Sequence, residues 1–316
     1  ATRAERRDRL AQARPPSRGE GSRPAYADPI SRFADAVKAG GLPWMPCPLR
    51  EFSRASLAKM TACARRTAST FAAKFRIAAC MTSILLTGSS RGIGAAAKAA
   101  LEARGAMVIG QATQSERTDT VPSDFCEPNA PHDLWHAALA RSGGKIDVLV
   151  NNAGLFDPNP IERSDIEWLD AWEDTMRINL TASAQLSRFA VRHWQERECP
   201  GRIVHVASRA GHRGDSPAHW HYAASKGGML AMHKSIARAY AGEGILSFAI
   251  TPGFTDTAMA GDYLESRGGP GLLADIPLGR VAEPDEIARL IEFCALDAPA
   301  SLTGATLDAN GASYVR

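Results

Sequence analysis

The chain has 316 residues, of which 45% are hydrophobic, and its formal net charge is +3. This length and composition allow a sizeable buried core in one large domain or two small ones. No run approaches the roughly 18 consecutive apolar residues of a membrane-spanning helix. The 6 cysteines form no CxxC pair and no zinc-type Cys/His spacing. We therefore expect a cytoplasmic protein with reduced thiols, no membrane association and no metal.

The charge is divided unevenly along the chain. Residues 1–80 carry a net +10 and residues 81–316 a net −7, so the part expected to fold is acidic and we expect no nucleic-acid partner; a membrane- or nucleic-acid-associated role of residues 1–80 is the alternative. The first 80 residues are rich in Arg, Ala, Ser and Pro, a composition that predicts disorder. Two amphipathic segments, Ile30–Ala39 and Ser56–Ala79, interrupt them, and the second resembles an organelle-targeting peptide placed internally. The simplest hypothesis is a functional protein that starts at Met81, after a basic, low-order extension over 1–80.

From Met81 onward short apolar runs alternate with longer helical patterns, which predicts α/β architecture. We expect a three-layer Rossmann fold, a doubly wound parallel sheet with helices on both faces, in a single domain over 81–316. The expected strands are Ile84–Thr87, Met107–Gly110, Val148–Asn151, Ile203–Ala207, Leu246–Ile250 and Thr306–Asp308. The expected helices are Ala95–Arg104, Leu134–Arg141, Trp168–Gln195, Tyr222–Glu243 and Pro284–Ala295.

A glycine-rich turn follows the first strand and leads directly into an alanine-rich helix. Glycines allow a tight turn and close approach of the backbone to a pyrophosphate, and the helix adds unpaired N–H groups and the positive end of its dipole. The turn therefore predicts a dinucleotide-phosphate site made by Gly88, Ser90, Arg91, Gly92, Ile93 and Gly94.

The end of the second strand indicates which dinucleotide is preferred. Rossmann enzymes that select NAD usually carry a carboxylate there, but this strand ends in Gly110-Gln111-Ala112-Thr113. Arg91, helped by the Thr113 hydroxyl, would instead bind a 2′-phosphate, which favours NADP(H) while leaving NAD(H) possible. The alternative is an Arg91 that points only to solvent. Only a short interval separates Thr113 from Asp124, so we expect the helix that usually stands at this place to be absent or shortened. Asp124 and Phe125 would then cover the adenine of the dinucleotide; the alternative is that they lie in a surface loop without a role.

Candidate catalytic residues follow later strands. Tyr222 and Lys226 are four residues apart and share one helical face, where an ammonium would lower the pKa of the phenol. Ser208 ends an apolar strand, at the sheet edge where ligands bind, and its hydroxyl would hold a substrate carbonyl. Asn179 lies inside an expected helix, where asparagine is an unfavourable residue, so we expect its side chain to have a role there. The alternative is that its side chain faces solvent. The small residues of Asn151-Asn152-Ala153-Gly154 would let a flat ring approach the backbone.

Together these motifs resemble the short-chain dehydrogenase/reductase family over essentially all of 81–316. Within this family, the glycine turn and the end of the second strand look most like the corresponding segments of the NADP-dependent 3-oxoacyl carrier-protein reductase branch. The resemblance also covers the segment Pro252–Thr257 and the last strand with its following glycine, Leu302–Gly311. Three features depart from the family: the interval between Ser208 and Tyr222 is one residue longer than usual, the region after the second strand is short, and the extension over 1–80 has no counterpart.

The resemblance implies a role for each residue. Tyr222 would exchange the proton with the carbonyl oxygen while hydride moves to or from the nicotinamide, Ser208 would polarise the carbonyl, and Asn179 would anchor a proton-relay water. Lys226 would hold the nicotinamide ribose and act on Tyr222. The resemblance further implies a homotetramer or dimer. The remaining residues expected to bind the cofactor are Asn152, Ala153, Gly154, Pro252, Gly253, Thr255 and Thr257.

Two further interpretations concern the expected substrate pocket, and a third concerns helix packing. His212 or Arg213 would meet a polar or anionic substrate group, and the glycine-containing segment over 254–276 would form a mobile lid. The tryptophans at 168, 172, 194 and 220 would pack helices.

The sequence thus predicts an NADP(H)-dependent oxidoreductase that interconverts the carbonyl and alcohol of a small molecule. The alternative is a catalytically weak dinucleotide-binding sensor or interaction subunit.

Overall fold

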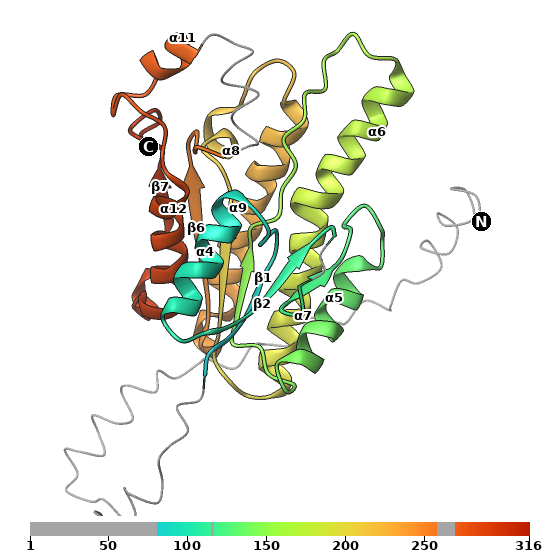
Figure 1. Cartoon of the computed structure of the whole chain (residues 1–316), viewed down its shortest axis with the longest axis vertical. Helices are drawn as coiled ribbons and strands as arrows, with labels where there is room; N and C mark the ends of the chain where they lie inside the picture. The colour runs from blue at the N-terminus through green and yellow to red at the C-terminus, as the bar shows by residue number, and fades with distance from the viewer. Residues whose placement is uncertain (1–80, 115–116, 258–268) are drawn as a thin grey trace, which may run out of the picture. The chain divides into compact units, whose positions relative to one another are not determined.

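A parallel β-sheet runs through the part of the chain that the computed structural model describes, residues 81–114, 117–257 and 269–316 (Figure 1). The extension over 1–80 and the middle of the expected lid, 258–268, lie outside these residues, so the interpretations made of them stay predictions.

The sheet has 7 strands in the order β3-β2-β1-β4-β5-β6-β7, and all neighbouring pairs are parallel. The chain winds outward from β1 in both directions, so the order reverses between β1 and β4. In such sheets ligands bind in the crevice outside the carboxyl ends of the strands at this reversal. The strands are β1 Ser83–Leu86, β2 Met107–Ala112, β3 Thr120–Pro122, β4 Val148–Asn151, β5 Gly201–Val206, β6 Ile245–Pro252 and β7 Thr306–Ala309.

Helices cover both faces of the sheet and make the three-layer Rossmann fold that the sequence predicts (Figure 1). The α-helices are α4 Gly92–Ala103, α5 Ala130–Arg141, α6 Asp165–Met176, α7 Ala182–Glu196, α8 Ala210–Arg213, α9 Trp220–Tyr240, α11 Gly269–Ala274 and α12 Pro284–Glu292. The described residues also contain two π-helical turns, η1 Arg177–Thr181 and η3 Phe293–Asp297, and two 3₁₀ turns, η2 Ala241–Glu243 and η4 Ala300–Leu302.

Alternation along the strands builds one apolar cluster on each face. Ile84 and Leu86 of β1 pack with α4 and α12, whereas Leu85 between them packs with α5 and α7. All three side chains are fully buried, and each contributes about 1.5–3 kcal/mol of burial free energy. Because both faces are covered, the central strands are continuous apolar runs, which is why they could be recognised in the sequence.

Two elements differ from the sequence prediction. The edge strand β3 was not expected; it is three residues long and ends at Pro122, which lacks the N–H that a further ladder bond would need. The single helix expected over Trp168–Gln195 is instead α6 and α7 joined by the π-helical turn η1. The expectation of a shortened connection after β2 is confirmed, since the described residues between β2 and β3 contain no helix.

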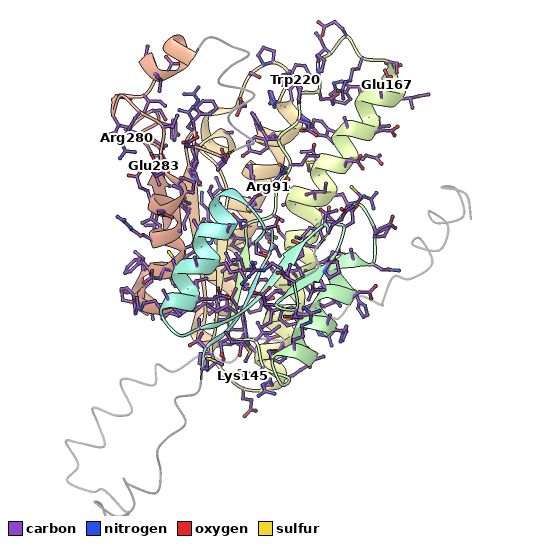
Figure 2. The ribbon with its side chains drawn as sticks, viewed as in Figure 1. Arg91, Lys145, Glu167, Trp220, Arg280 and Glu283 are labelled. Atoms are coloured by element: carbon purple, nitrogen blue, oxygen red, sulfur yellow. The ribbon has the colours of Figure 1, made fainter. Side chains whose placement is uncertain are left out.

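The tryptophans pack helices, with one exception. Trp194 is buried and donates its indole N–H to the Ile146 carbonyl over 2.7 Å, and the rings of Trp168 and Trp172 stack at 5.3 Å. Trp220 is 54% exposed at the start of α9, so the packing prediction is wrong for this residue (Figure 2).

Candidate functional site

The glycine turn between β1 and α4 packs so closely against neighbouring segments that side chains would not fit there. A Cβ at Gly88, whose φ is +64°, would lie 2.8 Å from the Ala153 Cα, and a Cβ at Gly94 would overlap the carbonyl oxygen of Gly88. A Cβ at Gly92, with φ +53°, would lie 2.9 Å from a Thr257 methyl carbon. The glycines therefore bring the loop after β4, the start of α4 and Thr257 into close contact.

The N-terminus of α4 offers its backbone N–H groups to a ligand. The N-cap residue, Arg91, makes no side-chain cap hydrogen bond, and the first turn holds no acidic residue. The first N–H groups of a helix have no partner within the helix, and its dipole attracts an anion there. The side chain of Arg91 is exposed beside this turn (Figure 2), which places a cation next to the same position.

A hydrogen-bonded clamp joins the glycine turn to the loop after β4. The Thr87 hydroxyl oxygen accepts from the N–H groups of Asn152 and Ala153 over 2.9 and 3.0 Å. The Asn152 side-chain amide donates in return to the carbonyls of Thr87 and Gly88, each over 3.0 Å. On the other side, the Gln111 side chain accepts from Gly88 N–H over 2.8 Å and donates to the Ser123 carbonyl over 2.7 Å. Sequence reasoning noted only that Gln111 is no carboxylate and missed this positioning role.

The expected catalytic side chains meet at the carboxyl ends of β4, β5 and β6. Ser208, which follows β5, and Tyr222, in the first turn of α9, line the same pocket, and the Ser208 side chain favours the ionised form of Tyr222 and so opposes a rise of its pKa. One turn further along α9, the Lys226 ammonium lies 5.7 Å from the centre of the Tyr222 ring and donates to the Val206 carbonyl over 2.9 Å. The structure thus brings the three residues together.

Asn179 lies in η1, is fully buried and has a partner for each polar atom of its side chain. Its amide oxygen accepts from Leu155 N–H over 2.7 Å, and its amide nitrogen donates to the Leu155 carbonyl over 3.0 Å and to the Ser225 hydroxyl over 3.1 Å. The solvent-facing alternative is therefore wrong. Asn179 ties the loop after β4 to α9, and the π-helical turn agrees with the frequent use of such turns at functional sites.

Burial dominates the electrostatics of this cluster. It raises the pKa of Tyr222 to about 12, in spite of the opposing effect of Ser208, and the negative charge of Asp215 adds to the rise. Burial also lowers the pKa of Lys226 to about 8. The expectation of a lowered Tyr222 pKa is therefore wrong in this structure, because desolvation of the phenolate raises the pKa.

One pocket of about 350 Å³ connects the glycine turn with the catalytic cluster. Ser208, Tyr222 and Lys226 line it, while Asn179 does not and lies behind Leu155. Its walls also include every residue that the sequence predicted to bind the cofactor, namely Gly88, Ser90, Arg91, Gly92, Ile93, Gly94, Thr113, Asp124, Phe125, Asn152, Ala153, Gly154, Tyr222, Lys226, Pro252, Gly253, Thr255 and Thr257.

Aromatic rings and a buried cation form the remaining wall near the cluster. Phe156 stacks on His219, with ring centroids 4.1 Å apart, and its ring meets the Tyr222 ring edge-on at 4.7 Å. Arg209, the residue after Ser208, is only 7% exposed, lines the pocket, and lies with its guanidinium 4.7 Å above the centre of the Phe254 ring. Sequence reasoning missed both side chains, because an Arg and a Phe in loops carry no pattern of their own.

His212 and Arg213 do not line this pocket, so the hypothesis that they meet a substrate group gains no support and stays a prediction. The His212 ring stacks on Tyr314 at 5.6 Å, and exposed Arg213 donates to the Ser313 carbonyl over 3.3 Å. Both therefore hold the C-terminal segment.

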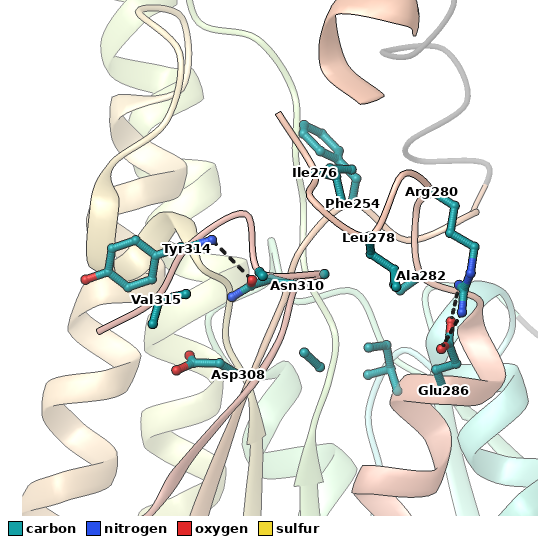
Figure 3. Close-up of a pocket in the computed structure, with 14 residues that line it drawn as sticks. Phe254, Ile276, Leu278, Arg280, Ala282, Glu286, Asp308, Asn310, Tyr314 and Val315 are labelled. Atoms are coloured by element: carbon teal, nitrogen blue, oxygen red, sulfur yellow. Dashed lines mark hydrogen bonds and ion pairs between the residues drawn. The ribbon is translucent and has the colours of Figure 1, made fainter. Parts of the chain in front are cut away.

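A second hollow of about 340 Å³ lies near the end of β7, and Phe254 belongs to the walls of both (Figure 3). It contains none of the expected catalytic residues. At its edges the Arg280 guanidinium pairs with the Glu286 carboxylate over 2.7 Å, and Tyr314 N–H donates to the Asn310 side chain over 3.2 Å.

No group of three or more His, Cys, Asp or Glu side chains in 81–114, 117–257 and 269–316 is arranged to hold a metal ion. Within the same ranges no helix has both the length and the apolar character needed to cross a membrane.

Comparison with known proteins agrees with this geometry. Residues 87–311 match the family model described as enoyl-(acyl carrier protein) reductase. The chain is 34% identical over 242 residues to 3-oxoacyl-(acyl-carrier-protein) reductase FabG of Salmonella typhimurium and of Escherichia coli, which covers 73% of this chain and 96% of each relative. It is 36% identical to the FabG of Vibrio cholerae with the same coverage. The chain belongs to the short-chain dehydrogenase/reductase family and is an oxidoreductase that acts on CH–OH and C=O groups with NAD(P).

Proposed function

We propose that the protein is an NADP(H)-preferring carbonyl reductase or alcohol dehydrogenase, with Ser208, Tyr222, Lys226 and Asn179 as its catalytic set. The observation that carries the proposal is that Ser208, Tyr222 and Lys226 line the same pocket as the glycine turn. A carbonyl oxygen bound beside the Ser208 and Tyr222 hydroxyls would receive a hydrogen bond from each, which polarises the carbonyl towards attack at carbon.

The protein's own residues then handle the proton. The nicotinamide, when bound, supplies hydride in reduction and accepts it in oxidation. Tyr222, whose pKa of about 12 keeps it protonated near neutral pH, gives its proton to the carbonyl oxygen in reduction and takes it back in oxidation. Lys226 has a pKa of about 8, so its ammonium can give a proton towards the Tyr222 phenol, and its amine can take one back, at modest energetic cost. Within the proposed set Asn179 acts by positioning, since its side chain is hydrogen-bonded to Leu155 and Ser225; the relay water stays an implication of the family resemblance.

The walls of the pocket support binding of a dinucleotide. The glycine turn lines the pocket, and its glycines allow the close packing of the turn against the loop after β4 and Thr257. The uncapped start of α4 supplies N–H donors for a diphosphate. A preference for the 2′-phosphate rests on Arg91 and Thr113, which line the same end of the pocket near Asp124, and on the amide of Gln111 at the position where NAD enzymes carry a carboxylate.

The preference is tested by comparing NADPH and NADH affinities, by fluorescence titration, in the wild type and in Arg91→Ala. We expect tighter NADPH binding in the wild type and a loss of about 10- to 100-fold for NADPH alone in the variant, as for a charge-assisted phosphate contact. Arg192→Ala on α7, an exposed arginine paired with Glu196, is the matched control. Equal wild-type affinities for the two cofactors would refute the 2′-phosphate argument.

The activity is tested with the full chain, both cofactors and a panel of carbonyl compounds and alcohols. The relatives are named for reduction of 3-oxoacyl groups on a carrier protein; for this chain we propose a small carbonyl or alcohol substrate, a homotetramer or dimer, and a cytoplasmic location. Turnover that Tyr222→Phe abolishes supports the proposal. Cofactor binding without any turnover would favour the sensor instead.

A further inference from the structure

A carboxylate lies in the wall of the pocket near the catalytic residues. Asp215 lines the pocket together with Ser208 and Tyr222, and it belongs to the loop between α8 and α9. This loop lies in the interval between Ser208 and Tyr222 that is one residue longer than usual in the family. Of the described lining residues that the proposed function assigns neither to the cofactor nor to the catalytic set, Asp215 is the only acidic one. It is therefore placed to contact a substrate.

Hydrogen bonds and ring contacts hold this loop beside the catalytic tyrosine. The Asp215 carboxylate accepts from Ser216 N–H over 2.7 Å, and the Ser216 hydroxyl is hydrogen-bonded to the His219 ring over 2.7 Å. His219 stacks on Phe156, and the Phe156 ring meets the Tyr222 ring edge-on at 4.7 Å. The carboxylate is thus part of an ordered loop, which lowers the entropy cost of binding a ligand to it.

The charge of Asp215 reaches the reacting end of the pocket. Burial is the main cause of the raised pKa of Tyr222, and the negative charge of Asp215 adds to the rise, so the carboxylate lies close enough to act on the phenol. Asp215 is exposed and takes part in none of the ion pairs found among the described residues. An ionised carboxylate accepts several hydrogen bonds, so the bond from Ser216 N–H leaves capacity for a substrate group.

The other described walls at this end are apolar or carry buried cations. Leu155 and Ile178 present apolar surface. Lys226 lies in α9 and donates to a carbonyl of β5, and Arg209 lies at the start of α8 with its guanidinium over an aromatic ring of the loop after β6. Both cations are buried whereas Asp215 is exposed, so a cation bound to Asp215 lies towards the mouth of the pocket, where solvent screens their repulsion. This end therefore suits a substrate with an apolar body and one cationic group.

We propose that Asp215 makes the enzyme selective for carbonyl compounds that carry a protonated amino group near the reacting carbonyl, that is, for amino ketones and the matching amino alcohols. This inference rests on the proposed function. In reduction, hydride adds to the carbonyl carbon, the Tyr222 proton adds to the oxygen, the C=O double bond becomes a single bond, and the ammonium group is unchanged; oxidation of the amino alcohol reverses these steps. A neutral substrate of the same shape forgoes the pairing with Asp215.

The test compares alcohols in which an ammonium group takes the place of a methyl group: 1-amino-2-propanol with 2-butanol, and 4-amino-2-butanol with 2-pentanol. Each is oxidised with NADP⁺ near neutral pH, where an aliphatic amine is protonated. Asp215→Asn should lower the ratio of kcat/KM for the amino alcohol to that for the neutral alcohol by about 5-fold, the upper range for an exposed ion pair. Asp215→Glu should keep part of the wild-type ratio. Asp170→Asn, at an exposed position of α6 that does not line the pocket, should keep all of it.

A second readout does not depend on turnover. In the presence of NADPH, which cannot oxidise an alcohol, the amino alcohols should raise the thermal midpoint of the wild type more than the neutral alcohols do, and Asp215→Asn should remove the difference. Cofactor titration of each variant checks that it is folded. A ratio that Asp215→Asn leaves unchanged in both pairs, or no ammonium-specific stabilisation, would overturn the inference while leaving the carbonyl reductase intact. Absence of turnover on every carbonyl compound and alcohol, with ammonium-specific stabilisation retained, would instead overturn the proposed function.

Discussion

Replacing Lys226 by Met should make the protein more stable at neutral pH, although it removes a proposed catalytic residue. The folded protein holds this ammonium at a pKa of about 8, below its ordinary value of 10.5, so keeping it charged costs about 3 kcal/mol. The variant also leaves the Val206 carbonyl without its 2.9 Å hydrogen bond, a loss of about 1 kcal/mol. The net expectation is a gain of about 2 kcal/mol near pH 7.

The dependence on pH gives the sharper test. Between pH 8 and 10.5 the unfolded chain binds the Lys226 proton and the folded protein does not, so wild-type stability rises with pH through this window, relative to the variant. Below pH 8 both states are protonated and the cost is constant. The advantage of Lys226→Met should therefore disappear towards pH 10.5.

Urea unfolding followed by circular dichroism, at several values from pH 7 to 10.5, measures this difference for the full chain. Lys234→Met, at an exposed position of the same helix, should show no such change with pH. A stability difference that stays constant across the window would refute the reasoning, because it would mean that Lys226 titrates alike in the folded and unfolded chain.

Three more substitutions follow from the structure. Tyr222→Phe should lower kcat by about 10²- to 10⁴-fold through loss of the proton donor while cofactor affinity in a fluorescence titration stays; an active variant would exclude Tyr222 as the acid. Gly94→Ala places a Cβ on the Gly88 carbonyl and should cost at least about 2 kcal/mol in urea unfolding, whereas Gly242→Ala, with open space around it, should be nearly neutral. Ser164→Ala removes the capping box of α6 and should cost about 1 kcal/mol in the same assay; an unchanged midpoint would show that the cap is dispensable.

The parts of the fold that could be predicted are those with an unambiguous hydrophobic pattern. The central strands are apolar on both faces, so their positions follow from composition alone, and Val148–Asn151 was placed with its observed bounds. The edge strand β3 has three residues, too few for any period to show. The helix break at η1 was missed because a π-helical turn adds one residue without a Gly or Pro to mark it.

The site shows the same limit at the level of single side chains. Motif spacing predicted which residues line the pocket, since glycine turns and a Tyr and Lys one turn apart have geometric meaning in the sequence. It could not predict the raised Tyr222 pKa, because burial depends on everything packed around the phenol. It could not predict Arg209 either, because the stacking on Phe254 joins two loops that are far apart in the chain.

The extra residue in the π-helical turn Arg177–Thr181 also fixes how α6 is phased against α7. Each α-helical residue advances the chain by about 100° and 1.5 Å. Deleting one residue from this turn would restore a regular α-helix and rotate α6 by about 100° about the helix axis. The whole outer face of α6 would then point in a new direction, so this segment tolerates substitution far better than a change in length.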